Sequence, residues 1–410
     1  MRGDKIYFSS CILKLTSNCN LNCSYCYMFN LKDTTHKAIP RFMSNETSLK
    51  TLHRIDEHLE EYPGRTFELI LHGGEPSLWP SENFDVFLAS FKLLQKKHSG
   101  LKIFLQTNGY RMLPEKTLSN LLELNTSIGI SLDGPKWLND KYRLTLDGRG
   151  TYETVMKNVE KLISGKYSEL LSGFLSVAEP SINPTEYFSW IKSMPVKSVD
   201  VLWPMQFTRR RPPWDFGGDI KYKESPRWGS WFAALFNIWI DEDDPSVKIR
   251  SFDELVRWAL GEKSHGDSVI NDRLEMIVVN TDGRIEYPDY LRNAWDGASR
   301  TNYSVQFNTL SELSNDRTFS LLSELGKSLP TECSGCLHKD ICGRGFLPGR
   351  TDEKELLSIY KSILCFDQYH YFHEAKKSIN ARLKNLITHD AEISDYDKTA
   401  IDRGIARTNT

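Results

Sequence analysis

The chain has 410 residues, and 52 Lys and Arg against 54 Asp and Glu give it a net charge of −2. This balance disfavours nucleic acid as a partner, because binding to phosphates requires a basic excess. Hydrophobic residues make up 40% of the chain, enough for a packed core, but no apolar run approaches the ~20 residues of a membrane span. The N-terminus lacks a signal-peptide layout, so we expect a soluble, cytoplasmic protein of two or three domains.

Six short apolar runs predict strands, and helical patterns separate them. The predicted strands are Ile12–Thr16, Phe67–His72, Ile103–Gln106, Ile128–Leu132, Phe174–Ala178 and Val199–Leu202. The predicted helices between them are Leu49–Leu59, Phe84–Lys96, Lys116–Leu124, Tyr152–Ile163 and Thr185–Ile191. Alternation of this kind predicts right-handed crossovers and a parallel sheet. Six units are too few for a closed eight-unit barrel, so we predict an α/β fold, a partial (β/α)6 TIM-like barrel with its chemistry at the carboxyl ends of the strands.

The pattern changes after about residue 205. Two helices are predicted at Trp228–Ile240 and Phe252–Leu260, followed by a β-hairpin. The hairpin joins Met276–Val279 to Arg284–Glu286 through Asp282-Gly283, a pair that favours a type I′ turn. From about Thr388 the chain is polar, and we expect a loosely held tail. The predicted domains are a partial barrel at 1–215, a helical bridging region at 216–285, a smaller cysteine-bearing domain at 286–385 and a polar tail at 386–410.

Eight cysteines are distributed unevenly along the chain. Six of them fall into two short clusters, whereas Cys11 and Cys365 stand apart. A secreted disulfide protein normally carries a signal sequence and spreads its cysteines more evenly. In a reducing compartment, tight clusters are more often metal or iron–sulfur sites. Cys11 is expected to be a small buried hydrophobe.

The first cluster, Cys19, Cys23 and Cys26, follows the first predicted strand directly. Asn and Ser residues between the cysteines favour a loop, because their side chains compete for backbone hydrogen bonds. A cubane iron–sulfur cluster normally has four thiolate ligands. Three thiolates would leave one iron free to bind a small molecule. A three-ligand zinc site, which would more often include His, and unrelated core cysteines are the alternatives.

Polar residues also stand at the ends of the next three predicted strands. Glycines at the end of the second strand would let the backbone approach a ligand closely, and the glutamate after them offers a carboxylate to a cation; a tight turn is the alternative. An arginine beyond the fourth strand could bind a carboxylate bidentately or form an ordinary surface ion pair. These residues are Gly73, Gly74, Glu75, Gln106, Asn108, Ser131 and Arg143.

The C-x3-C-x2-C spacing, with Tyr25 inside it, resembles that of the radical S-adenosylmethionine (SAM) enzymes. The resemblance implies a [4Fe-4S] cluster on Cys19, Cys23 and Cys26. The reduced cluster would split SAM, and a 5′-deoxyadenosyl radical would take hydrogen from a substrate. By the same resemblance, the residues that contact SAM are Tyr25, Gly73, Gly74, Glu75, Gln106, Asn108, Ser131, Arg143 and Leu202.

The second cluster, Cys333, Cys336 and Cys342, gains a fourth thiolate from Cys365. Four ligands close a site, which suits an electron carrier or a structural staple, and Zn(Cys)4 fits the spacing as well. The segment resembles the SPASM auxiliary-cluster domain of peptide-maturing radical enzymes, which include anaerobic sulfatase maturases. Those enzymes usually have seven cysteines and two auxiliary clusters. The resemblance therefore implies one auxiliary [4Fe-4S] cluster here.

Two positions depart from the SPASM pattern. Phe346 stands four residues after Cys342, and Tyr287-Pro288-Asp289 stands where a Cys-Asp pair is often found. The resemblance implies that Asp289 is a general base, which must lie within hydrogen-bond reach of the proton that it removes. An ordinary hairpin carboxylate is the alternative.

The run from Cys342 to Asp367 resembles peptide maturases most closely, in particular the three-residue cyclophane (triceptide) synthases. The resemblance implies hydrogen abstraction from a side chain of a ribosomally made precursor peptide and a carbon–carbon cross-link. Formylglycine formation as in the sulfatase maturases, peptide epimerisation, thioether formation and a non-catalytic iron–sulfur or zinc scaffold are the alternatives. An electron donor such as flavodoxin or ferredoxin is the second implied partner.

Peptide recognition is the least defined part of the prediction. The aromatic and basic segment Trp203–Phe216 could line a peptide groove, or it could be a loop with buried aromatic residues. Only ten residues precede Cys11, which leaves no room for a separate leader-binding domain before it. Recognition of a leader would then use the region around 215–285 or a partner.

Overall fold

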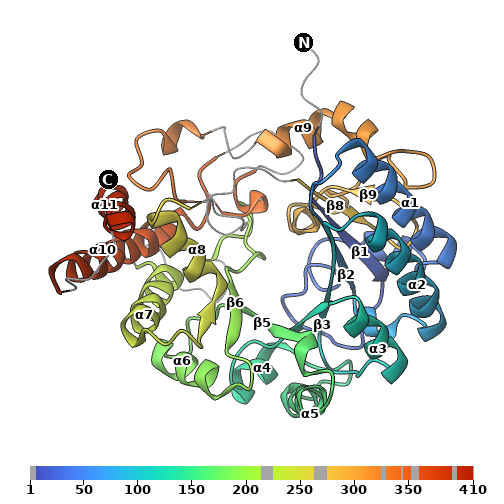
Figure 1. Cartoon of the computed structure of the whole chain (residues 1–410), viewed down its shortest axis with the longest axis horizontal. Helices are drawn as coiled ribbons and strands as arrows, with labels where there is room; N and C mark the ends of the chain where they lie inside the picture. Colours follow the sequence, from blue (N-terminus) through green and yellow to red (C-terminus); the bar gives the residue numbers. More distant parts are fainter. Residues whose placement is uncertain are drawn as a thin grey trace. The chain divides into compact units, whose positions relative to one another are not determined.

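In the computed structural model, strands alternate with helices through the first half of the chain (Figure 1). The structure describes residues 6–213, 225–262, 275–324, 329–342, 345–351, 360–389 and 395–409. The chain packs as two compact units. The first unit comprises Met1–Leu175 and Arg273–Glu324, and the second comprises Ser176–Asp272 and Leu325–Thr410. Each unit therefore combines two segments that are distant in the sequence.

A largely parallel sheet forms the centre of the first unit. Its strand order is β5-β4-β3-β2-β1-β8-β9, and all neighbours from β5 to β8 run parallel. The α/β class and the parallel sheet predicted from the sequence are confirmed. The first five strands are β1 (Ser10–Thr16), β2 (Phe67–Gly73), β3 (Leu101–Thr107), β4 (Ser127–Ser131) and β5 (Leu171–Val177).

The crossover helices of the first unit agree with the predicted helices. Ser44 caps α1 through an oxygen that accepts a hydrogen bond from Thr47 N at 3.1 Å. Three phenylalanines of α2 recur at helical spacing and are fully buried, which explains why this pattern was readable in the sequence. The seven-residue α4 was not predicted, because it is too short to show a period. The helices are α1 (Asn45–Glu61), α2 (Ser81–Lys97), α3 (Glu115–Glu123), α4 (Lys136–Tyr142) and α5 (Tyr152–Ile163).

The predicted hairpin adds two strands to this sheet. β8 (Met276–Val279) pairs parallel with β1 and antiparallel with β9 (Ile285–Glu286). The predicted type I′ turn is wrong. Such a turn needs a positive φ at both central residues, but only Gly283 has one, at +81°, and Asp282 does not. Gly283 N donates to Asn280 O at 2.8 Å. The loop is thus a turn closed by a left-handed glycine, which suits a longer hairpin loop.

The second unit has a pair of short parallel strands and an aromatic core. β6 (Ser198–Leu202) pairs with β7 (Lys248–Ile249). Trp203 stacks on Phe232 with ring centroids 4.2 Å apart, and Tyr371 meets both rings. The helices of this unit are α6 (Pro184–Ser193), α7 (Arg227–Glu242), α8 (Arg250–Ala259), α10 (Cys365–His389) and α11 (Asp395–Asn409).

The loosely held tail that we predicted from Thr388 is wrong for residues 395–409, which form α11. Thr408 Oγ1 accepts a hydrogen bond from Asn380 Nδ2 of α10 at 2.9 Å. Arg407 donates to Trp258 O of α8 at 2.7 Å. Specific polar contacts therefore hold a helix whose few large apolar residues gave no signal in the sequence.

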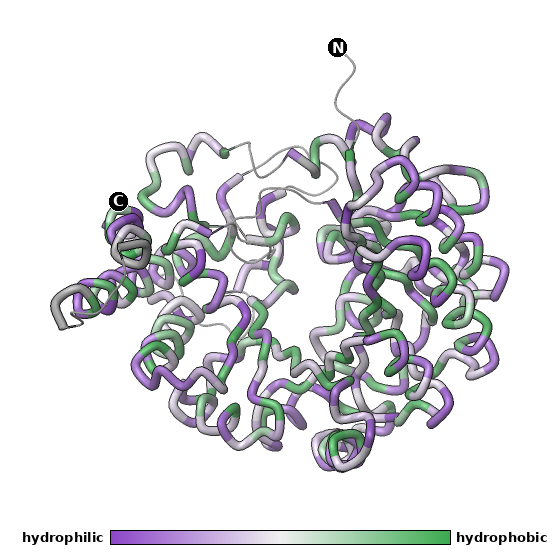
Figure 2. The backbone as a smooth tube through the Cα atoms, in the orientation of Figure 1, coloured by the Kyte–Doolittle hydropathy of each residue, from purple (hydrophilic) through white to green (hydrophobic). Residues whose placement is uncertain are grey.

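Short helices complete the described chain: η1 (Thr35–Ala38), η2 (Pro76–Leu78), η3 (Ser168–Leu170), η6 (Asp289–Asn293), η7 (Ser311–Asn315), α9 (Arg317–Glu324), η8 (Thr331–Cys333) and η9 (Leu347–Gly349). Hydrophilic and hydrophobic stretches alternate along the helices (Figure 2). In the described ranges, none of the helices combines the length and the apolar character that a bilayer crossing requires.

Candidate active site

The three cysteines of the first cluster, here called the cysteine triad, lie on a loop that follows β1, as predicted. Backbone hydrogen bonds fix this loop against the segment after α4. Asn22 N donates to Leu144 O at 2.7 Å, and Ser24 N donates to Tyr142 O at 3.1 Å. Arg143 stands between these two acceptors, so its position relative to the triad is set by the backbone.

The thiols of the triad act on one another electrostatically, which shows that they are gathered in one place. Burial raises the pKa of Cys19 to about 12, and the neighbouring Cys23 and Cys26 contribute to the rise. Burial also raises the pKa of Cys23 to about 11, although the charge of Arg143 opposes it. Buried thiols of this kind become thiolates when they coordinate a metal. Three gathered thiols beside a cation suit a negatively charged cluster.

The two glycines at the end of β2 allow the backbone to approach the triad loop. A Cβ on Gly73, whose φ is +152°, would lie 2.7 Å from Thr16 O. A Cβ on Gly74 would lie 2.2 Å from Asn18 O, immediately before Cys19. The close approach that the structure shows is thus to the chain itself, whereas the predicted approach to a ligand stays a prediction.

Glu75 lies directly after these glycines and is buried, with 1% of its surface exposed. Its Oε1 accepts hydrogen bonds from Ser77 N at 2.9 Å and Thr107 Oγ1 at 2.6 Å, and its Oε2 accepts from Asn108 N at 2.7 Å. The carboxylate therefore ties the end of β2 to the end of β3. Its predicted contact with SAM stays a prediction, and the observed role is to position the neighbouring strand end.

The polar residues that end β3 and β4 meet as the parallel sheet requires. Gln106 Nε2 donates to Ser131 Oγ at 2.9 Å, in space that exists because Gly129 has no side chain. Asn108 Nδ2 lies 2.8 Å from Asn20 Oδ1 and 3.6 Å from Cys19 Sγ. The structure thus brings Gln106 and Ser131 together and places Asn108 beside the triad loop.

Tyr25 bonds both Arg143 and an aspartate that was not predicted, Asp133. Tyr25 OH donates to Asp133 Oδ2 at 2.5 Å, and Arg143 Nη1 donates to Tyr25 OH at 2.8 Å. Arg143 is buried, so the surface ion pair considered as an alternative is wrong. Asp133 lies two residues after Ser131, and an acidic side chain close in sequence to the expected Arg143 was the available signal.

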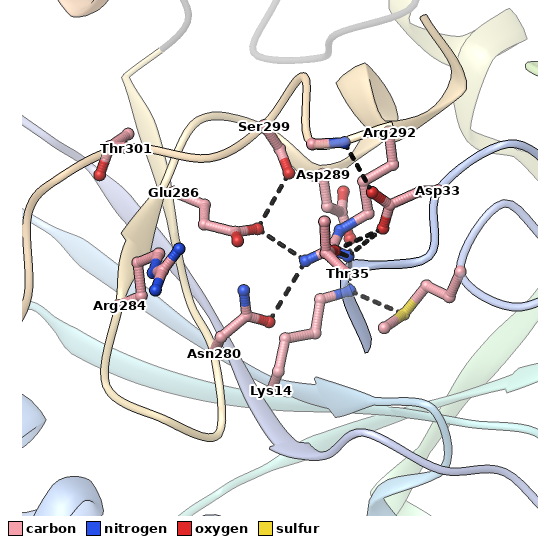
Figure 3. A network of polar contacts seen from close by, with 12 residues as sticks. Lys14, Asp33, Thr35, Asn280, Arg284, Glu286, Asp289, Arg292, Ser299 and Thr301 are labelled. Carbon is pink, nitrogen blue, oxygen red and sulfur yellow. Dashed lines mark hydrogen bonds and ion pairs between the residues drawn. The ribbon is translucent and has the colours of Figure 1, made fainter. Parts of the chain in front are cut away.

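Asp289 is part of a buried group of polar residues that we call the Lys14 cluster: Lys14, Tyr27, His72 and Asp289 (Figure 3 shows the lysine and the aspartate). Lys14 Nζ lies 2.5 Å from Asp289 Oδ2 and 3.3 Å from His72 Nδ1. Tyr27 OH donates to the same Oδ2 at 2.6 Å. In the described chain, Asp289 Oδ1 has no hydrogen-bond partner.

The electrostatics keep Asp289 ionised. Burial by itself would raise the pKa of Asp289, but the charge of Lys14, together with the hydrogen bonds, holds it below its usual range. Burial and the neighbouring ammonium lower the pKa of His72 to about 3, so this imidazole is neutral. Burial raises the pKa of Cys26, and the Lys14 charge partly opposes this rise, so the Lys14 cluster lies close to the triad. A lysine within an otherwise apolar predicted strand was the signal that we missed.

A second buried group, here called the Arg292 cluster, lies next to the first in Figure 3: Asp33, Thr35, Asn280, Glu286, Arg292 and Ser299. Arg292 Nη1 lies 2.6 Å from Asp33 Oδ2, and its Nη2 lies 2.6 Å from Glu286 Oε2. None of the Arg292 side chain is exposed. The cluster ties the triad loop region to the β8–β9 hairpin and η6, on which Asp289 stands.

In the second unit, all four cysteines predicted for the auxiliary site line one cavity. Burial raises the pKa of Cys365, to which Cys333 and Cys336 also contribute. The side chains of His338 and Gln368 line the same cavity. The residues present therefore fit a group that is bound by four thiolates.

The remaining predicted residues include an aromatic pair of the second unit. Trp203 and Phe207 are buried in the second unit, with 8% and 5% exposure, which agrees with the second of the two interpretations, a loop with buried aromatic residues, and not with a peptide groove. Trp214 and Phe216 lie outside the described residues. Leu202 ends β6 in the second unit, and its predicted contact with SAM stays a prediction. Cys11 is fully buried among apolar residues, as predicted.

Comparison with known proteins agrees with this geometry. The Radical SAM superfamily matches residues 13–177. A cysteine-type anaerobic sulfatase-maturating enzyme of Clostridium perfringens is 26% identical over 369 residues, which cover 88% of this chain and 94% of that protein. A serine-type enzyme of Bacteroides thetaiotaomicron is 23% identical over 398 residues, which cover 91% of this chain and 90% of that protein.

Solved structures share the fold. The structure of native anSMEcpe with bound AdoMet has a TM-score of 0.73 at 23% identity and covers 92% of this chain and 99% of that one. The complex of the same protein with AdoMet and the Cp18Cys peptide has a TM-score of 0.72 at 24% identity, with 92% and 99% covered. The matched segment 13–177 contains the cysteine triad and the polar ends of β2, β3 and β4. Residues 13–177 of this chain thus form a radical SAM domain, and the enzyme uses a [4Fe-4S] cluster and SAM.

Proposed function

We propose that this enzyme oxidises a side-chain carbon of a peptide by two electrons. The bound cofactors supply a 5′-deoxyadenosyl radical that removes a hydrogen atom from the substrate. Completing the oxidation then requires the loss of one further electron and one proton from the substrate. The observation that carries the proposal is the ionised Asp289, held close to the cysteine triad with one carboxylate oxygen open.

The residues at the strand ends would hold SAM. The Arg143 guanidinium, kept in place by Tyr25, offers donors to the SAM carboxylate. Gln106 and Ser131 lie together on adjacent strands and offer polar groups to the ribose. Glu75 and Asn108 position the loop between β3 and α3 beside Cys19. The proposal keeps all SAM contacts that were predicted in the first unit: Tyr25, Gly73, Gly74, Glu75, Gln106, Asn108, Ser131 and Arg143.

Asp289 would accept the substrate proton at Oδ1. Lys14 and Tyr27 both bind Oδ2, which fixes the carboxylate plane and keeps the group charged. The low pKa makes Asp289 a weak base in the ground state. A weak base is strong enough for this step, because a proton on a carbon that has already lost an electron is strongly acidic.

The four thiols of the second unit would hold one auxiliary [4Fe-4S] cluster in a SPASM-like domain, predicted at 286–385. An electron leaving the substrate needs an acceptor, and a fully ligated cluster suits that role better than a structural zinc. The gathering of all four cysteines around one cavity supports this assignment.

The peptide-oxidising relatives favour formylglycine formation. The Clostridium and Bacteroides enzymes are sulfatase-maturating enzymes of cysteine and serine type, and one solved relative was determined with a bound peptide. In that reaction, the oxidised carbon of Cys or Ser ends as an aldehyde, and a cysteine sulfur leaves after hydrolysis. An electron donor such as flavodoxin or ferredoxin would supply the electron for SAM cleavage.

Cross-link formation of the cyclophane type is the second candidate. One observation favours it: the strand end before Asp289 has Tyr287 and Pro288 in place of a cysteine, a departure from the pattern of the sulfatase maturases. In this reaction, the side-chain radical would add to an aromatic ring. Loss of an electron, and of the ring proton to Asp289, would then restore aromaticity.

An anaerobic assay of the reconstituted enzyme distinguishes these reactions. The probes are SAM, a strong reductant and two pools of synthetic peptides, one with Cys or Ser and one with an aromatic residue two positions from an aliphatic one. We expect deoxyadenosine with the first pool and replacement of a thiol or hydroxyl by an aldehyde. Loss of only two hydrogens, with a new carbon–carbon bond in the second pool, would establish the cyclophane reaction instead.

Asp289→Asn tests the base within the same assay. We expect product formation to fall by about 10²–10⁴-fold while deoxyadenosine formation continues, because the cofactor sites stay intact. Asp282→Asn, in the turn of the β8–β9 hairpin and outside both buried clusters, is the control and should leave both rates unchanged. Product formation by Asp289→Asn at the unmodified rate would remove Asp289 from the mechanism.

A further inference from the structure

Two buried polar side chains face the cavity of the four cysteines without a partner. His338 is 3% exposed, and in the described structure neither ring nitrogen has a hydrogen-bond partner. Gln368 is 6% exposed, and its Oε1 likewise has none there. Both residues line the cavity together with Cys333, Cys336, Cys342 and Cys365.

The backbone and the neighbouring rings fix the His338 imidazole in place. His338 N donates to Cys336 Sγ at 3.4 Å, and His338 O accepts from Cys342 N at 2.8 Å. The ring of Tyr369 meets the imidazole edge-on at 4.6 Å between centroids. These contacts hold the ring inside the loop between two cysteines, so it cannot turn out to water without breaking the loop.

The side-chain amide of Gln368 is also held in place, by α10 and by the backbone at Gly345. It lies one turn after Cys365 in α10, and a Cβ on Gly345 would lie 2.8 Å from its Nε2. The glycine therefore leaves room for the amide. An amide has donors on one side and an acceptor on the other, so a half-turn of the amide presents N–H groups to the cavity.

Leaving these groups unpaired would be costly. A buried polar group without a partner loses about 1–3 kcal/mol, and native proteins satisfy nearly all such groups. The missing partner must then be an acceptor that lies in the cavity. Cluster sulfides and thiolate sulfurs are acceptors, and an imidazole has at least one N–H to donate in either protonation state.

We propose that His338 donates a hydrogen bond to a sulfur of the auxiliary cluster, with Gln368 beside it, and so raises the reduction potential of that cluster. The inference rests on the auxiliary cluster proposed above. Four thiolates already ligate the cube, so His338 is a positioning residue and not a ligand. A donor at sulfur withdraws electron density and stabilises the more negative, reduced state.

The test isolates the auxiliary cluster in the full-length chain by replacing Cys19, Cys23 and Cys26 with alanine. After anaerobic reconstitution, iron is counted and the potential is measured by titration followed by electron paramagnetic resonance. His338→Ala in this background should retain its iron. Its ratio of reduced to oxidised cluster at fixed potential should fall by about tenfold, which corresponds to a potential about 59 mV more negative.

Two variants sharpen the result. His338→Gln keeps an N–H donor and should recover part of the shift. His373→Ala removes a histidine that lies near His338, at 5.8 Å between rings, but does not line the cavity. It should leave the potential unchanged. Equal shifts in the His338→Ala and His373→Ala variants would overturn the proposal.

Nitrogen-15 labelling of histidine provides a second measurement on the unmodified His338. A weak coupling of the reduced cluster to histidine, together with an exchangeable proton, supports the hydrogen bond. No coupling, or the strong coupling of a direct iron–nitrogen bond, overturns it. Zinc without iron in the triad-free protein would instead show that the proposed auxiliary cluster is wrong, and the hydrogen bond would be excluded with it.

Discussion

The Lys14 cluster and the Arg292 cluster lie side by side in the first unit (Figure 3) but are built differently. In the Arg292 cluster, both oxygens of Asp33 accept hydrogen bonds, and the arginine fork joins Asp33 to Glu286. In the Lys14 cluster, all contacts of Asp289 fall on Oδ2, and Oδ1 has no partner among the described residues. The difference indicates that the Arg292 cluster holds the hairpin in place, whereas the Lys14 cluster leaves Oδ1 of Asp289 open for the proton that we propose it accepts.

Removing the central arginine should give the largest effect of this comparison. Arg292→Met leaves the carboxylates of Asp33 and Glu286 buried with no counter-charge. We expect a loss of about 3–5 kcal/mol in the free energy of unfolding, measured by denaturant titration. Arg250→Met breaks a half-exposed pair with Asp200 and should cost at most about 1 kcal/mol. Equal losses in the two variants would contradict a structural role for the Arg292 cluster.

Removing the lysine should change the pH dependence of product formation. Lys14→Met takes away the charge that holds the Asp289 pKa low, so burial should raise that pKa above its usual range. The base acts when ionised, so product formation should be lost as the pH falls through the raised pKa, about tenfold per unit below it. Deoxyadenosine formation should not show this loss at low pH.

In the unmodified enzyme, product formation should not fall over the same range of pH. Lys102→Met, at an exposed lysine of β3, is the matched control. A pH profile of Lys14→Met identical to that of the unmodified enzyme would separate Lys14 from Asp289.

The smallest effect is expected at Tyr27. Tyr27→Phe removes one hydrogen bond to the charged Oδ2, which should cost about 1.5 kcal/mol in stability and reduce product formation only a few-fold. Tyr187→Phe removes a buried bond to the neutral Ser176 hydroxyl at 2.7 Å. It should cost about 1 kcal/mol without changing product formation. An unchanged product rate in Tyr27→Phe would show that Lys14 alone positions Asp289.

The strands, and the residues at their ends, could be predicted because short apolar runs in the local sequence indicate where each strand begins and ends. Buried and more exposed residues alternate along two of these strands, Phe67–Gly73 and Leu101–Thr107. Parallel strands bring their carboxyl ends to one edge of the sheet. The partners of those residues could not be predicted. Asp133 was not predicted, because its hydrogen bond to Tyr25 joins residues 108 positions apart in the sequence. The sequence also left open whether Trp203 and Phe207 line a groove or are buried, because the exposure of an aromatic side chain depends on what packs over it.

The sequence by itself determined that the chain has two thiol sites, an alternating α/β region and carboxylates and cations at strand ends, because spacing and periodicity are local properties. Only the tertiary structure decided that residues 273–324 pack with the N-terminal unit, which brings Asp289 to Lys14. It also decided that a polar C-terminal segment forms α11. Both outcomes depend on contacts between residues far apart in the chain, and the desolvation and charge that set the Asp289 pKa exist only once those contacts form.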